Sequence, residues 1–178
     1  MQQDLIRHLD EAVTEVFGVM LNLSCTAEPE QVAAANPLDR PPYFNASVLF
    51  SGRLQGRCCL QFDEQTATKL TSNLMGISGC EISRDLCADT AGELCNMIAG
   101  CWKKRHPQDL AASLLSCPIV TQGQCQHGID NNREDVTLLY HLDGHRLTLR
   151  LAFNYSNSPD QTHKRVRGNP RTPSSSIP

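Results

Sequence analysis

The chain has 178 residues, which is enough for one domain with a sizeable core and fewer than two independent cores would need. Its composition, 40% hydrophobic and 20% charged, is ordinary for a globular protein. No run approaches the roughly 18 continuous apolar residues of a membrane span, and the charged N-terminal stretch is unlike a secretory signal. We therefore expect a cytoplasmic protein without membrane contact. The formal net charge is -3, and four cations against one carboxylate in residues 160–178 leave the rest of the chain acidic, which argues against nucleic-acid binding.

The N-terminal segment is predicted to form an amphipathic helix. Apolar residues recur in it at intervals of three and four, which places them on one inward-facing stripe: Leu5, Leu9, Val13, Val16, Phe17 and Met20. Residues 22–42 are expected to be irregular because four prolines interrupt regular pairing: Pro29, Pro37, Pro41 and Pro42.

Two β-hairpins are predicted further along the chain. Residues 46–62 alternate between apolar and polar with a period of two, and Ser51-Gly52 interrupts this run. Nearer the C-terminus, residues 135–142 and 145–153 form a second pair joined by Asp143-Gly144. That dipeptide suits a tight hairpin turn, because both turn positions need positive φ.

Two helices and one strand are predicted between the hairpins. Asp63 can cap a short helix that runs through Leu74, and Gly76 offers a stop. A longer helix spans residues 83–106, because the proline that follows disfavours the helical conformation at the residue before it. Residues 110–120 read as a strand.

This order of elements predicts a single α+β domain over residues 1–155, with long helices packed on a largely antiparallel sheet. Residues 156–178 are rich in Ser, Pro and basic residues and hold almost no large apolar groups. Such a segment cannot offset the entropy of ordering, so we expect a disordered tail.

The most informative stretch is residues 89–100, on the longer helix. At about 100° per residue, one side carries a carboxylate at each of two positions, a carboxamide and two glycines: Asp89, Glu93, Asn96, Gly92 and Gly100. The core stripe gathers opposite: Cys87, Ala91, Leu94, Ile98 and Cys101. Glycine costs about 0.5–1 kcal/mol relative to alanine in a helix, so we expect these glycines to permit close approach of another molecule. Glu and Asn one turn apart also occur by chance on solvated helices, so the pair alone assigns no function.

The wider context resembles the CheC, CheX and FliY chemotaxis phosphatases. Their signature is an acidic or hydroxyl residue, then Glu, then Asn, at the spacing of Asp89, Glu93 and Asn96, and residues 93–100 read like the helix of the CheX-like branch. Residues 117–123, with Pro followed by a short apolar run and Gly, resemble the strand that follows that helix. The likeness spans about residues 5–153, but only the helix is specific.

The resemblance implies a phosphatase that hydrolyses the phospho-aspartate of a CheY-like response regulator. Asn96 would orient the attacking water, since a carboxamide offers an acceptor and donors without titrating. Glu93 would pair with the active-site lysine of the phosphorylated receiver domain, and Asp89, Gly92 and Gly100 would contact that partner. The Mg²⁺ that this chemistry needs would belong to the receiver domain, so we expect no metal or other cofactor on this chain.

Two further possibilities stay open. CheC-type members carry two Glu and Asn pairs, whereas this chain has one, which resembles the CheX branch and implies a homodimer. The same superfamily contributes domains to the flagellar switch, so a non-catalytic interaction module of a chemosensory or flagellar-switch assembly is the alternative function.

The nine cysteines leave a third possibility, redox or metal sensing. Their number is odd and their spacing irregular, and no Cys-x-x-Cys pair exists, so reduced thiols are expected. Cys58 and Cys59 should point to opposite faces of a strand. Cys117, Cys125 and His127 offer one loose set of zinc ligands, whereas structural zinc sites usually use two tight pairs.

Overall fold

The computed structural model describes residues 2–28, 43–77, 81–105, 113–123 and 134–155. The predicted C-terminal tail, most of the proline-rich segment, and both Cys125 and His127 lie outside these ranges. The helices are α1 (Gln2–Leu21), α2 (Glu64–Met75) and α3 (Arg84–Arg105). The strands are β1 (Thr26–Ala27), β2 (Tyr43–Ser51), β3 (Leu54–Asp63), β4 (Leu114–Leu115), β5 (Ile119–Gln122), β6 (Glu134–Leu142) and β7 (His145–Tyr155).

The seven strands of the described ranges join one antiparallel sheet in the order β1-β6-β7-β3-β2-β4, and β5 also pairs with β2. Both predicted hairpins are present, as β2–β3 and β6–β7. The turn of the second uses positive φ at Asp143 (44°) and Gly144 (81°), as its sequence predicts. The α+β prediction is therefore confirmed.

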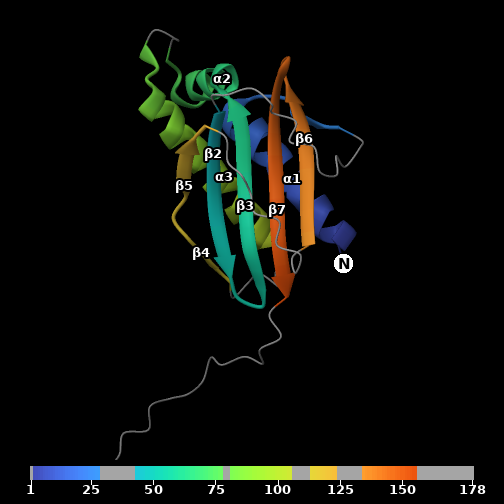
Figure 1. The fold of residues 1–178 in the computed structure, drawn as a ribbon. Coiled ribbons are helices and arrows are strands. Elements are labelled where there is room, and N and C mark those ends of the chain that lie inside the picture. Colours follow the sequence, from blue (N-terminus) through green and yellow to red (C-terminus); the bar gives the residue numbers. More distant parts are fainter. Residues whose placement is uncertain (1, 29–42, 78–80, 106–112, 124–133, 156–178) are drawn as a thin grey trace, which may run out of the picture.

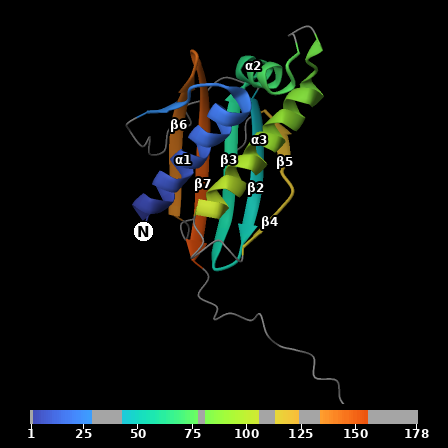
Figure 2. The same cartoon turned by 180° about the vertical axis from the view of Figure 1, so that it is seen from behind.

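One face of the sheet carries the helices. Figures 1 and 2 show α1 and α3 lying across the same face, with α2 at one end, and none of the helices in the described ranges covers the other face. Alternate strand residues point toward the helices and are fully buried there; they include Val48, Leu60, Leu149 and Phe153. The sheet and the two long helices thus share one apolar core.

Two of the strand predictions need correction. Of the strand expected at 110–120, residues 110–112 lie outside the described ranges, and the rest forms β4 and the start of β5, two short strands on the outer side of β2. The strand is divided because Pro118 has no N–H for the ladder and Ser116 bonds in place of a regular pair. The Ser116 N–H donates to the Leu49 carbonyl (2.9 Å), and the Leu49 N–H donates to Ser116 Oγ (3.0 Å). The two-residue strand β1, within the stretch expected to be irregular, was not predicted.

Helix α2 has the predicted caps. The Thr66 N–H donates to Asp63 Oδ1 (2.7 Å) at its start, and Gly76 (φ 66°) closes its end by donating its N–H to the Ser72 carbonyl (2.9 Å). Helix α1 buries the predicted stripe except for Met20, which is 49% exposed, whereas its neighbour Leu21 is buried in the core.

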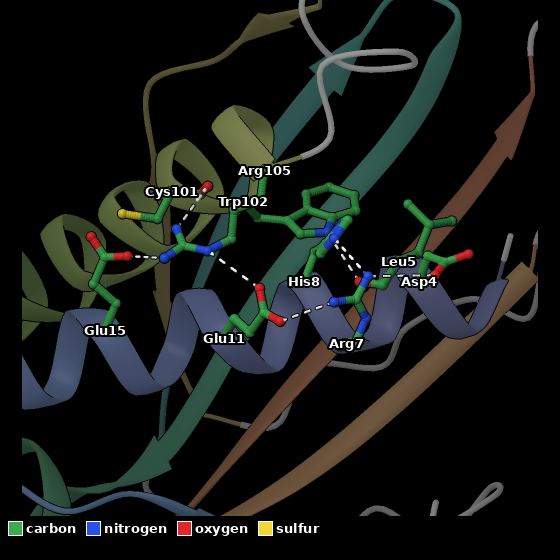
Figure 3. A network of polar contacts seen from close by, with 9 residues as sticks. All are labelled: Asp4, Leu5, Arg7, His8, Glu11, Glu15, Cys101, Trp102 and Arg105. Carbon is green, nitrogen blue, oxygen red and sulfur yellow. Dashed lines mark hydrogen bonds and ion pairs between the residues drawn. The ribbon is translucent and has the colours of Figure 1, made fainter.

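Helix α1 and helix α3 are tied together at one end (Figure 3). Trp102 is fully buried; its Nε1–H donates to the Leu5 carbonyl at 3.2 Å, and its ring packs edge-on against Phe50 at 5.3 Å. Arg105 forms ion pairs with Glu15 and, at 3.7 Å, with Glu11. These contacts fix how α3 is rotated on the sheet.

None of the helices in the described part of the chain is long and apolar enough to cross a membrane.

Candidate functional site

The candidate site lies on α3, whose rotation is set by its buried residues. The helix begins after Ser83, which accepts a hydrogen bond from the Leu86 N–H through Oγ (3.2 Å). Of the predicted core stripe, Cys87, Ala91, Leu94 and Ile98 are buried as expected, whereas Cys101 is only half-buried. The buried arc is wider than predicted, since it also includes Thr90, Gly92, Cys95, Ala99 and Trp102.

The outward face of α3 carries the predicted catalytic pair. Glu93 is exposed and Asn96 half-buried, and a helix rise of about 1.5 Å per residue separates them by roughly 4.5 Å along the axis. Asp89 is exposed one turn before Glu93. Within the described part of the chain, none of these three side chains has a hydrogen bond or an ion pair. A carboxylate and a carboxamide therefore stand side by side with their polar atoms available to a partner.

The two glycines of this helix differ in their surroundings. A Cβ atom on Gly92 would lie 3.2 Å from Val120 Cγ2 and 3.4 Å from Pro118 Cγ, and Gly92 is buried. The close approach at Gly92 is thus made by β5 and the residue before it, which gives this glycine a role in packing within the chain, and its contact with a partner stays a prediction. Gly100 is half-buried and would have nothing within 4 Å of a Cβ atom, which leaves open space for another molecule.

Sequence reasoning missed the contact of the 118–120 segment with α3. The pattern of Pro and apolar residues in 117–123 is a family likeness, and its spacing does not predict that this segment contacts Gly92. Because residues 89 and 96 flank residue 92 along a helix, Pro118 stands beside the outward face between Asp89 and Asn96. It forms one side of the candidate site.

Other constellations lie away from this face. Within the described ranges, no group of three His, Cys, Asp or Glu side chains could hold a metal ion, and the seven cysteines there are free thiols. Cys58 faces the helices in the core, while its neighbour Cys59 is buried on the other side of the sheet. A pocket of about 150 Å³ on that other side is lined by Asn45, Ala46, Ser47, Arg57, Cys59, Ile119 and Thr121.

Comparisons with known proteins converge on one family. A family model described as "Chemotaxis phosphatase CheX" matches residues 44–138, more than half of the chain. A search of curated protein sequences gave no significant match.

Solved structures share the fold at low identity. Chemotaxis protein CheX from Vibrio vulnificus has a TM-score of 0.69 and 16% identity over 84% of this chain and 96% of its own. The CheX–CheY–BeF3–Mg²⁺ complex from Borrelia burgdorferi has a TM-score of 0.64 and 18% identity over 84% of this chain and 97% of its own. FliY from Thermotoga maritima has a TM-score of 0.59 and 15% identity over 86% of this chain and 87% of its own. At these identities the likeness establishes a shared fold.

Proposed function

Because the chain belongs to the chemotaxis phosphatase CheX family, we propose that it dephosphorylates a CheY-like response regulator. The observation that carries the proposal is the pair Glu93 and Asn96, one turn apart on the outward face of α3 and without polar partners in the described ranges. The similar CheX–CheY complex supports a receiver domain as the partner.

The proposed reaction transfers a phosphoryl group from an aspartate to water. The water oxygen attacks phosphorus, the bond between phosphorus and the aspartyl oxygen breaks, and the water proton leaves with inorganic phosphate or solvent. Asn96 orients the water in line with the breaking bond, and its neutral carboxamide adds no charge to an anionic site. Glu93 pairs with the lysine of the receiver site and fixes the register of the two proteins. Asp89 and Gly100 lie on the same face and complete the surface that receives the partner.

We place the Mg²⁺ of this reaction in the receiver domain. In phosphoryl transfer the metal neutralises charge that develops on the phosphoryl oxygens, and the neighbouring solved complex contains BeF3 and Mg²⁺ together with CheY. A homodimer, implied by the resemblance to the CheX branch, belongs to the same proposal.

The test measures the decay of a phosphorylated receiver domain with Mg²⁺, alone and with this protein. The wild type should accelerate decay, and Asn96→Ala should lose about 100-fold or more of the acceleration while still binding the activated receiver, because water positioning is lost and docking is not. Glu93→Ala should weaken both binding and turnover. Gln65→Ala, an exposed carboxamide on α2, is the matched control and should behave as wild type.

Two results would overturn parts of this proposal. Normal turnover by Asn96→Ala would remove Asn96 from the mechanism. No acceleration by the wild type with any receiver of the host would favour a non-catalytic interaction module, a role compatible with the structural likeness to FliY.

A further inference from the structure

The charged residues of α3 divide into two groups. The charged residues at its two ends form ion pairs with other helices. Arg84 Nε lies 3.1 Å from Glu64 Oε1 on α2. Arg105 pairs with Glu15 and Glu11 on α1 (Figure 3). The other five have no ion pair or hydrogen bond with any residue in the described ranges: Asp85, Asp89, Glu93, Lys103 and Lys104.

The five unpaired charges share the outward face and are sorted by sign. At about 100° per residue, all five fall within roughly 60° of Asp89 around the helix axis. The acidic three occupy the N-terminal half, and the two lysines follow Asn96 and Gly100. The rise of about 1.5 Å per residue places Lys103 and Lys104 roughly 11 Å beyond Asn96 along the axis. Gly100 lies between Asn96 and the two lysines, and no side chain extends from it.

From this arrangement we propose that Lys103 and Lys104 form a second docking contact, which binds acidic side chains on the surface of the receiver domain. The inference rests on the proposed function and adds to it the direction in which the partner lies along α3. A receiver whose lysine meets Glu93 would place its acidic side chains about 15–17 Å farther along the helix axis, over the two lysines. The reversed orientation would bring like charges together, so the sorted charges select one orientation.

The helix dipole explains only part of this pattern. Anions in the first turn and cations in the last turn stabilise a helix, which accounts for the ends at which Asp85 and the lysines occur. The effect fades beyond one turn, so it gives no reason for Asp89 and Glu93. A dipole role changes the stability of this protein alone, whereas a docking role changes its association with the receiver, and the two are separable by experiment.

The experiment compares steady-state dephosphorylation of the receiver by the full chain and by the double variant Lys103→Gln/Lys104→Gln. We expect KM to rise about 3–10-fold at low salt, as for two exposed ion pairs, with kcat unchanged and the difference shrinking in about 0.5 M salt as charges are screened. Charge reversal, Lys103→Glu/Lys104→Glu, should raise KM further. Lys69→Gln on α2 removes one positive charge elsewhere and should leave KM unchanged.

The conservative variant Lys103→Arg/Lys104→Arg should restore the wild-type KM and its salt dependence, and circular dichroism checks that each variant is folded. A wild-type KM in the folded Gln and Glu variants would overturn the second contact while leaving the phosphatase intact. No acceleration or receiver binding by the wild type would overturn the proposed function itself, and the second contact with it.

Discussion

The Cγ atom of Pro118 lies 3.4 Å from the position that a Cβ atom would occupy on Gly92, the residue directly before Glu93. This contact joins the segment before β5 to the turn of α3 that carries the proposed catalytic pair. A side chain at position 92 would push Pro118 and Val120 outward, so glycine here serves intramolecular packing.

Substitution of the two glycines should separate their roles in stability. Gly100→Ala should raise the free energy of unfolding by about 0.5–1 kcal/mol, because alanine is the better helix former and its methyl group meets nothing within 4 Å. Gly92→Ala should raise the free energy of unfolding by less, since its methyl group would lie only 3.2 Å from Val120 Cγ2. Gly92→Val should lose about 1–3 kcal/mol through overpacking. Urea unfolding followed by circular dichroism measures all three.

The same variants test the surface around Gly100. If the receiver approaches closely there, Gly100→Ala should raise KM even though it stabilises the fold. A stabilised Gly100→Ala with wild-type KM would mean that the partner keeps its distance at this turn. Equal stability gains for the alanine variants at positions 92 and 100 would contradict the packing role of Gly92.

Local signals account for most of what the sequence predicted. Helix α2 begins after Asp63 and ends at Gly76, as predicted, because capping depends on residues within one turn. Asp143-Gly144 forms the turn of the second hairpin because that turn itself demands positive φ. The outward placement of Glu93 follows from helical periodicity alone.

Contacts between distant segments account for what the sequence did not predict. Strand β1 has only two residues and is held from afar: the Glu28 N–H just beyond it donates to the Leu139 carbonyl (2.8 Å), and the Glu28 carboxylate pairs with His141. The packing of Pro118 on Gly92 likewise joins elements whose relative position no local pattern encodes. Tertiary packing, which periodicity does not describe, decides both.

The buried indole of Trp102 should be a measurable anchor between α1 and α3. Trp102→Phe keeps an aromatic ring beside Phe50 but leaves the Leu5 carbonyl without its 3.2 Å donor, so we expect a loss of about 1–3 kcal/mol in the free energy of unfolding. Trp102→Ala should cost about 3–5 kcal/mol, because it also opens a cavity. Urea titrations followed by circular dichroism provide the values, since Trp102 is the chain's only tryptophan. A Trp102→Phe variant as stable as the wild type would show that the hydrogen bond contributes nothing.

The thiol of Cys25 should make the fold sensitive to alkaline pH. Burial, reinforced by the negative charge of Asp10, raises the pKa of Cys25 from 9.0 to about 12. Between these values the unfolded chain releases a proton that the folded chain retains, so this thiol's contribution to stability is complete below about pH 9 and is lost as pH rises toward 12. Cys25→Ala should therefore lose less stability than the wild type between pH 8 and pH 10.

Urea midpoints at pH 8, 9 and 10 measure this difference, and comparison with the variant cancels the groups that titrate in both proteins. Cys117→Ala, which removes an exposed thiol, is the matched control and should follow the wild-type pH dependence. Alkylation gives an independent check: iodoacetamide at pH 8 should modify Cys117 in the folded protein well before Cys25, because the thiolate is the reactive form and burial limits access. Identical pH dependence in the wild type and Cys25→Ala, together with rapid labelling of Cys25, would mean that its thiol ionises freely in the folded chain.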